Sequence, residues 1–236
     1  MRLYLIPLLF CLPICLASAQ EAATAQPTAL PATEPAKVGM SAETLAKVPQ
    51  ALQKLVDDGK VAGAVVTVAR KGKIVLNEAV GYADKEAKRP METDSVVRIY
   101  SMTKPITSTS VMMLAEQGKL KLDDSVSKYI PELAKPQVYV SGESDDAKFE
   151  PANREVTVRD LLRHTSGYTY GFFGNSYVDK QYQKAMILAP FADLEATVAK
   201  IGKQPLLHQP GTHFNYSVST DVVGRLSEVV SGQTLD

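Results

Sequence analysis

Cysteine and histidine are both scarce in this sequence. The two cysteines, Cys11 and Cys15, lie in the apolar first stretch of the chain. If that stretch is removed, the remaining chain has no disulfide, no thiol nucleophile and no cysteine metal site. The three histidines, His164, His208 and His213, show neither metal-ligand spacing nor an H-E-x-x-H pattern. We therefore expect no metal site and no cofactor.

An excess of charge of either sign is also missing. The 26 basic residues balance the 26 acidic residues, and no run of like charges occurs. This balance argues against nucleic acid or an anionic membrane surface as a partner. With 45% hydrophobic and 22% charged residues, the composition is that of an ordinary globular protein.

The N-terminal stretch has the three parts of a secretory signal. Arg2 supplies the positive end, residues 3–16 form the apolar segment, and Ala17-Ser18-Ala19 is a cleavage site before Gln20. The apolar run is too short, and too often interrupted by proline, to form a stable membrane span. We expect residues 1–19 to be cleaved and the product to be secreted, into the periplasm if the source is a Gram-negative bacterium.

Three regions follow this predicted signal peptide. Residues 20–37 are rich in alanine, proline and threonine without apolar periodicity, which predicts a disordered linker. Residues 38–100 predict a helix followed by a β-hairpin. Residues 101–236 predict a mostly helical region. From Leu120 onward, short helical patterns alternate with loops, and several of these patterns close on a glycine.

The first of these structured regions has clear local signals. Ser41 is suited to cap the N-terminus of the helix. Two runs rich in β-branched residues, Ala64–Arg70 and Lys73–Gly81, are separated by two residues and predict a hairpin. A shorter apolar run, Ser95–Tyr100, has a strand-like pattern and leads directly into Ser101.

The pattern S-x-x-K occurs twice. Ser125 and Lys128 follow two aspartates in a polar stretch, where helix capping and a solvated lysine explain them. Ser101 and Lys104 lie between an apolar run and an apolar helix, near a helix N-terminus that favours developing negative charge. Lys104 lies one turn later on the same face, and it would act as a base only if its pKa were lowered. Lowering that pKa by ~3 units costs about 4 kcal/mol, so a neighbouring group must contribute part of this free energy.

The stretch RIYSMTKPIT around Ser101 resembles the nucleophile motif of the serine β-lactamase and penicillin-binding-protein superfamily. Further blocks agree in order: GKLKLDDSVSKYIPEL, VTVRDLLRHTSGY and QPGTHFNYSVSTDVVGRLSEVVSG. Together they are similar to the class C β-lactamase-like branch, which includes family VIII carboxylesterases and D-alanyl-D-alanine peptidases. The resemblance runs from about Val38 to the last residue. It implies an α+β fold with an α/β sheet subdomain and a helical subdomain.

The resemblance also implies roles for individual residues. Ser101 would be the acylated nucleophile, Lys104 its proton relay, and Tyr216 a general base whose phenolate character Lys104 supports. The Y-x-N motif of the β-lactamases falls on Tyr216-Ser217-Val218. Valine has no hydrogen-bonding group for a lactam or peptide amide, and esterases of this branch often lack the asparagine. Val218 therefore favours esters as substrates.

A third motif of the family, K-T-G or an H-x-G or W-x-G equivalent, does not occur in the 20 residues after Tyr216. In the family, the strand that carries it supplies one of the two oxyanion-hole N–H groups. Losing one such donor costs roughly 10²–10³-fold in rate. We therefore expect a truncated product that lacks the C-terminal sheet strands and exposes apolar surface in their place.

An aromatic cluster follows the H-T-S-G sequence and consists of Tyr168, Tyr170, Phe172 and Phe173. It fits core packing and an apolar acyl pocket about equally, and the glycines among its members favour a loop and hence the pocket. We assign Tyr170 and Phe172, together with Val218, to substrate binding. His164 is expected to belong to a structural turn near the site.

These observations predict a serine hydrolase that cleaves carboxylic esters through an acyl-enzyme on Ser101, impaired by truncation. The substrate would be a small-molecule ester or lactam. Within the enzyme class, the alternative is a β-lactamase or a D-alanyl-D-alanine carboxypeptidase. Outside that class, the alternative is an inactive fragment or a binding module.

Overall fold

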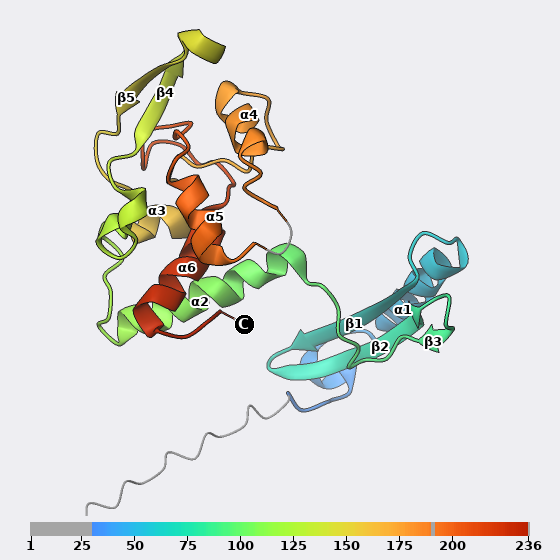
Figure 1. The fold of residues 1–236 in the computed structure, drawn as a ribbon. Helices are drawn as coiled ribbons and strands as arrows, with labels where there is room; N and C mark the ends of the chain where they lie inside the picture. Colours follow the sequence, from blue (N-terminus) through green and yellow to red (C-terminus); the bar gives the residue numbers. More distant parts are fainter. Residues whose placement is uncertain (1–29, 190–191, 236) are drawn as a thin grey trace, which may run out of the picture. The chain divides into compact units, whose positions relative to one another are not determined.

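The computed structural model describes residues 30–189 and 192–235, so the predicted signal peptide lies outside the described residues. The described residues form two compact units, which divide between Val97 and Arg98 (Figure 1). Helices and strands occur together, as expected for an α+β protein. No helix in these two ranges is long and apolar enough to cross a membrane.

The first unit consists of one helix on a small antiparallel sheet. Its elements are α1 (Ala42–Asp57), β1 (Gly63–Arg70), β2 (Lys73–Asp84) and β3 (Arg89–Pro90). As predicted, α1 begins after Ser41, whose hydroxyl accepts a hydrogen bond of 3.2 Å from the Thr44 N–H. The sheet order is β1-β2-β3, and α1 packs against β1 and β2.

The predicted hairpin is confirmed. Arg70 pairs with Lys73, so only Lys71 and Gly72 form the turn between β1 and β2. Both turn residues have positive φ, 52° and 69°. This conformation twists the chain in the direction that the two strands require, and glycine adopts it without steric cost.

The predicted linker is partly wrong. Residues 30–37 are described, and part of this stretch is paired with the sheet. Ala32 forms a β-bridge with Ile74, where the Thr33 N–H donates to the Ile74 carbonyl at 2.8 Å. A 3₁₀-helix, η1 (Pro35–Val38), follows. Backbone groups make the contacts with Ile74, so the Ala/Pro/Thr composition of the stretch did not reveal them.

The predicted strand at Ser95–Tyr100 is also wrong. Residues 95–99 have no strand partner among the described residues, and Tyr100 begins a 3₁₀-turn. Val96 and Val97 are exposed, so the apolar composition of the run does not reflect burial. A β-strand needs a neighbour for its backbone groups, and this run has none in the described ranges.

The second unit is mainly helical and is built around two long helices (Figure 1). Helix α2 (Thr103–Glu116) lies along α6 (Ser219–Ser231), and the Ser110 and Ser227 hydroxyls meet at 3.0 Å. The shorter α3 (Val158–Leu162) and α5 (Leu194–Ile201) also pack on α6. The remaining elements are α4 (Tyr177–Lys184), the hairpin β4 (Gln137–Ser141) and β5 (Lys148–Pro151), η2 (Tyr100–Met102), η3 (Val126–Lys128), η4 (Pro131–Leu133) and η5 (Ser144–Asp146).

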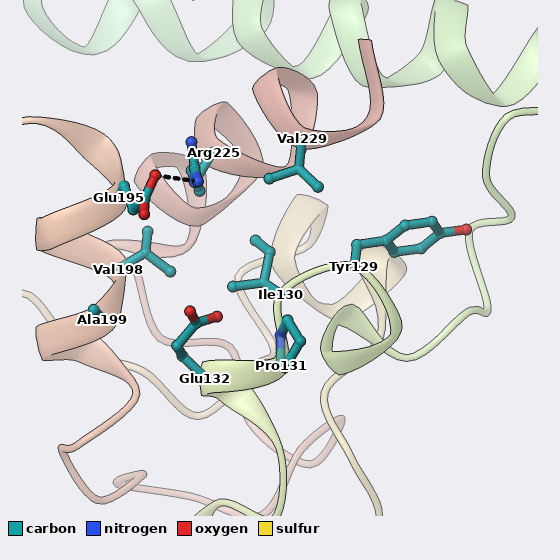
Figure 2. A pocket seen from close by; sticks show the side chains of 9 residues that line it. All are labelled: Tyr129, Ile130, Pro131, Glu132, Glu195, Val198, Ala199, Arg225 and Val229. Carbon is teal, nitrogen blue, oxygen red and sulfur yellow. Dashed lines mark hydrogen bonds and ion pairs between the residues drawn. The ribbon is translucent and has the colours of Figure 1, made fainter. Parts of the chain in front are cut away.

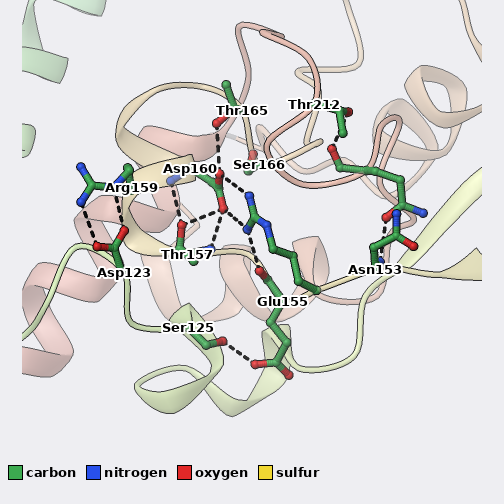
Figure 3. Close-up of polar contacts among 12 residues, drawn as sticks. Asp123, Ser125, Asn153, Glu155, Thr157, Arg159, Asp160, Thr165, Ser166 and Thr212 are labelled. Atoms are coloured by element: carbon green, nitrogen blue, oxygen red, sulfur yellow. Dashed lines mark hydrogen bonds and ion pairs between the residues drawn. The ribbon is translucent and has the colours of Figure 1, made fainter.

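A buried carboxylate organises the start of α3. Asp160 accepts hydrogen bonds from both the N–H and the hydroxyl of Thr157, which completes a capping box (Figure 3). Arg154 binds the same carboxylate with two nitrogens, at 2.5 and 2.9 Å, and Thr165 adds a bond at 3.2 Å. Burial alone would raise the pKa of Asp160, but Arg154 and Thr157 together lower it. The ionised carboxylate therefore ties α3 to the turn that follows it.

Candidate active site

Ser101 lies in the 3₁₀-turn η2, immediately before the first residue of α2. The free N–H groups of the first turn of α2 and the helix dipole favour negative charge near this hydroxyl, as expected. Pro105 lies within the first turn of this helix, where proline is tolerated. Ser101 is exposed, and Tyr100 before it has a positive φ of 45°.

Three residues from separate motifs meet at this hydroxyl. The Tyr216 hydroxyl donates to Ser101 Oγ at 2.9 Å, and Lys104 Nζ donates to the same oxygen at 3.4 Å. Lys104 Nζ also lies 5.0 Å from the centre of the Tyr216 ring and 5.5 Å from that of Tyr170. The structure thus brings the predicted nucleophile, relay and base within direct reach of one another.

The condition under which Lys104 would itself act as a base, a lowered pKa, is not met. Burial alone would lower the pKa of Lys104, but polar interactions with the hydroxyls of Tyr170 and Tyr216 outweigh it and raise that pKa. Lys104 is only partly buried, so the desolvation of its ammonium is incomplete. In this arrangement Lys104 is a fixed cation rather than a free amine.

The pKa of Tyr216 moves in the opposite direction. Hydrogen bonding to Ser101, followed by interaction with Lys104, lowers the pKa of the Tyr216 phenol below its ordinary value. The ammonium stabilises the phenolate, and the phenolate is the form that can accept a proton from Ser101. The geometry therefore suits Tyr216 as the base and Lys104 as the cation that supports it.

An aromatic surface extends outward from Tyr216. The Tyr170 ring lies 5.4 Å from that of Tyr216, and Phe172 and Phe173 lie 5.2 and 5.6 Å from Tyr170. Phe173 also approaches Tyr216 directly, at 6.0 Å. Phe172 and Phe173 are 56% and 67% exposed, so their faces are available for apolar contact. We call Tyr170, Phe172 and Phe173 the aromatic rim.

One member of the aromatic cluster, Tyr168, and one residue assigned to substrate binding, Val218, belong to the core. Tyr168 is buried, and its phenol pKa is raised by burial. Val218 is 0% exposed and packs in the hydrophobic core at the start of α6. The prediction that residue 218 faces the substrate is therefore not what the structure shows. Its apolar side chain instead stabilises the helix that follows Tyr216.

The side chains of the serine and lysine in the second S-x-x-K pattern make structural contacts with other residues. The Ser125 hydroxyl caps η3 and donates to the Glu155 carboxylate (Figure 3). Lys128 pairs with Asp124 at 2.9 Å rather than with the serine. This serine is bound to an anion, whereas Ser101 accepts a hydrogen bond from the Lys104 ammonium.

The histidines show no metal site. Among the described residues, no group of three or more histidine, aspartate or glutamate side chains is arranged to hold a metal ion. His208 and His213 stack on each other with ring centres 4.4 Å apart. His164 lies against Tyr216, with ring centres 4.8 Å apart, in the turn where the sequence placed it.

Sequence reasoning missed one charged neighbour of the site. Asp221, in the first turn of α6, lines a small pocket of about 180 Å³ together with Lys104 and Thr107 of α2. Burial raises the pKa of Asp221, and the positive charge of Lys104 partly opposes that effect. The residue lies one helical turn beyond the Tyr216 motif, and nothing in its local sequence signals burial.

A different pocket, of about 210 Å³, lies away from these residues (Figure 2). Its walls come from α5, α6 and the segment Tyr129–Glu132, with Ile130, Val198 and Val229 on its apolar side. At its edge Arg225 binds Glu195 at 2.6 Å. It contains none of the residues predicted for catalysis.

Known proteins resemble this chain over most of its length. A family model described as Beta-lactamase matches residues 48–236. Esterase EstB of Burkholderia gladioli is 34% identical over 206 residues, which cover 86% of this chain and 50% of the esterase. Lovastatin esterase of Penicillium rubens is 34% identical over 187 residues, or 78% of this chain and 46% of that enzyme.

The fold comparison gives the same result. The structure of EstCE1, described as a hydrolase with promiscuous acyltransferase activity, matches with a TM-score of 0.69 and 32% identity. That match covers 82% of this chain and 49% of the other. The chain spans about half the length of the curated relatives it matches. On the family match over residues 48–236, the chain belongs to the β-lactamase family of serine hydrolases and esterases.

Proposed function

We propose that this chain carries the acylation machinery of a serine hydrolase that cleaves carboxylic esters. The observation that carries the proposal is the contact of 2.9 Å between the Tyr216 hydroxyl and Ser101 Oγ beside the Lys104 ammonium. A nucleophile, a base of lowered pKa and a supporting cation are the parts that acyl transfer to serine requires.

The proton path is argued from the lowered pKa of Tyr216 and the raised pKa of Lys104. The Tyr216 phenolate takes the proton of Ser101 as Oγ attacks the ester carbonyl and forms a tetrahedral oxyanion. The N–H of Ser101 offers one oxyanion donor near the N-terminus of α2. When the tetrahedral species collapses, Tyr216 returns the proton to the departing alkoxide and the acyl group stays on Ser101. Water then attacks the acyl-enzyme with Tyr216 again as base, which releases the carboxylic acid and restores Ser101.

Two observations favour esters over lactams or peptides. Relatives that are about one-third identical over most of this chain are named esterases. The aromatic rim adds an apolar surface beside the nucleophile, which suits an apolar acyl or alkoxy group.

Covalent labelling tests the proposal most directly. A fluorophosphonate probe should modify Ser101, and peptide mass spectrometry should locate the adduct. Ser101→Ala should abolish labelling, whereas Ser125→Ala is the matched control and should leave it intact. No adduct on Ser101 in the folded chain would favour an inactive or binding role.

A second experiment distinguishes ester substrates from lactam substrates. Turnover of p-nitrophenyl butyrate and of nitrocefin should be measured on the chain and on a form extended to the length of its relatives. We expect ester turnover to exceed lactam turnover in both. Efficient nitrocefin hydrolysis without ester activity would instead assign a β-lactamase.

Export is part of the proposal as well. Residues 1–19 have the features of a cleavable signal, so the mature chain would begin at Gln20 in a secreted or periplasmic protein. Fractionation of expressing cells followed by N-terminal sequencing tests this. A cytoplasmic product that retains Met1 would contradict it.

A further inference from the structure

The loop that carries Tyr216 is bound on both sides of that residue by a single partner, His164. The His164 carbonyl accepts a hydrogen bond from the Asn215 N–H at 2.8 Å. Its ring Nδ1 accepts one from the Ser217 N–H at 3.3 Å. Tyr216 is the residue between these two anchored positions, and the centre of its ring lies 4.8 Å from that of the imidazole.

These bonds belong to a wider connection between the same two segments. The Asn215 side-chain amide donates to the Tyr168 carbonyl at 2.8 Å. The buried hydroxyls of Ser166 and Ser219 meet at 2.8 Å, just beyond the loop. His164 itself has a φ of 54°, a conformation that is costly for most residues and persists only where surrounding contacts hold it.

The bond to Ser217 depends on the charge of the ring. A ring nitrogen that accepts a hydrogen bond carries no proton, so this arrangement requires neutral His164 with its proton on Nε2. Protonation would convert Nδ1 into a donor that faces the Ser217 N–H, and the bond would be lost. Two titratable groups face the ring: Lys104 from α2 and the phenol of Tyr216. Burial, followed by the positive charge of Lys104, lowers the pKa of His164, so the ring is neutral at neutral pH.

Building on the proposed function, we propose that His164 is a positioning residue for the general base. In its neutral form it holds residues 215–217 so that the Tyr216 hydroxyl stays within reach of Ser101. When His164 is protonated, the loop loses one of its two anchors on this residue. The chain would then contain an acid-sensitive control of its own nucleophile.

The test compares two replacements of similar size. Asparagine places Oδ1 where histidine has Nδ1, tolerates a positive φ and does not titrate. Leucine has neither an acceptor nor a charge. We expect His164→Leu to slow fluorophosphonate labelling of Ser101 by about 10²-fold at all pH values, as for a base displaced by about 1 Å. His164→Asn should keep most of the labelling rate of the unmodified chain.

The pH profile separates positioning from general stability. With Tyr216 as the base, the logarithm of the labelling rate should rise with pH at a slope of about one. Below the lowered pKa of His164, the slope of the unmodified chain should steepen to about two. His164→Asn should keep a slope of about one throughout. His208→Asn, at another half-buried histidine, is the matched control and should retain the steepening.

Amide hydrogen exchange gives a readout independent of catalysis. The Ser217 N–H should be protected in the unmodified chain and in His164→Asn, and unprotected in His164→Leu. If the unmodified chain is not labelled, the proposed function fails, while exchange at Ser217 still tests the contact. Equal labelling of all three proteins, or a steepened slope in His164→Asn, would overturn the inference. If His164→Leu does not fold, two measurements still test whether His164 positions Tyr216. They are the pH dependence of labelling in His164→Asn and the pH dependence of Ser217 N–H protection in the unmodified chain.

Discussion

The Tyr216 hydroxyl and Ser101 Oγ lie 2.9 Å apart although 115 residues separate them in the sequence. Removing this hydroxyl removes the base and leaves the ring and its packing in place. Tyr216→Phe should therefore slow acylation of Ser101 by ~10²–10⁴-fold, the usual contribution of a positioned base. Stopped-flow or gel-based labelling rates measure this. Tyr82→Phe, at an exposed tyrosine of β2, should behave like the unmodified chain.

The opposite pKa directions of Lys104 and Tyr216 predict the pH dependence of acylation. Tyr216 accepts a proton only as phenolate, so the rate should rise with pH and level off below the ordinary tyrosine value of about 10. Lys104→Met removes the cation that helps to lower the Tyr216 pKa, and the rise should move to higher pH. Tyrosinate absorbance during titration provides a second measure. An unchanged profile in Lys104→Met would contradict the assignment of Lys104 as the supporting cation.

The aromatic rim should determine preference among apolar substrates. Replacing Phe172 and Phe173 together by alanine removes two exposed ring faces beside the nucleophile. We expect kcat/KM for p-nitrophenyl octanoate to fall by about ten-fold, a loss typical of removed apolar pocket contacts, with little effect on the acetate. Phe149→Ala, in the β4–β5 hairpin, is the control and should leave both substrates unaffected. Equal losses on the two esters would show that the rim does not bind the acyl chain.

The Arg154–Asp160 pair should contribute strongly to stability. The Asp160 carboxylate is buried and binds both Arg154 and the backbone of Thr157. Asp160→Ala leaves these donors unpaired and should lower the free energy of unfolding by about 3 kcal/mol, as for a broken buried ion pair. Asp123→Ala breaks the exposed pair with Arg159 and should change stability little. Urea denaturation of both variants measures the contrast.

The contribution of the Asp160 carboxylate to the free energy of unfolding should decrease as the pH falls. The pKa of Asp160 is lowered in the folded state, so its contribution is present above the unfolded value of about 3.9. It is lost as the pH falls through the lowered folded value. The difference between the unmodified chain and Asp160→Ala should therefore be full at neutral pH and shrink in strong acid.

Unlike Asp160, Asp221 should destabilise the folded state when it is ionised. Burial raises its pKa, so ionising it costs folding free energy once the pH exceeds the unfolded value. Asp221→Asn removes that cost and should raise the melting temperature at neutral pH but not at low pH. Asp94→Asn, at an exposed aspartate, serves as the control. A lower melting temperature for Asp221→Asn at neutral pH would show that the carboxylate stabilises the fold through Lys104.

Local signals in the sequence predicted much of the fold. The cap at Ser41 and the two-residue turn at Lys71-Gly72 depend on neighbours within a few residues, and both were confirmed. The composition of residues 30–37 and 95–100 was misleading, because order there depends on distant backbone partners. Pairing with Ile74 orders part of the first segment, while the second finds no such partner among the described residues.

The candidate site was predictable as a set of residues but not as an electrostatic arrangement. The S-x-x-K spacing indicated Ser101 and Lys104, the family resemblance indicated Tyr216, and the structure brings the three into contact. The raised pKa of Lys104 depends on partial exposure and on Tyr170, which no motif indicates. The burial of Val218 and the two bonds of His164 are likewise properties of packing between distant segments.

The pairing of α2 with α6 has a consequence for the unfinished protein. Ser101 precedes α2 and Tyr216 precedes α6, so the two meet only after the core between these helices has formed. Before that point Ser101 is an ordinary serine hydroxyl with no base beside it. The contact between Tyr216 and Ser101 therefore depends on the packing of α2 on α6, and a chain in which these helices are not packed together has no base at Ser101.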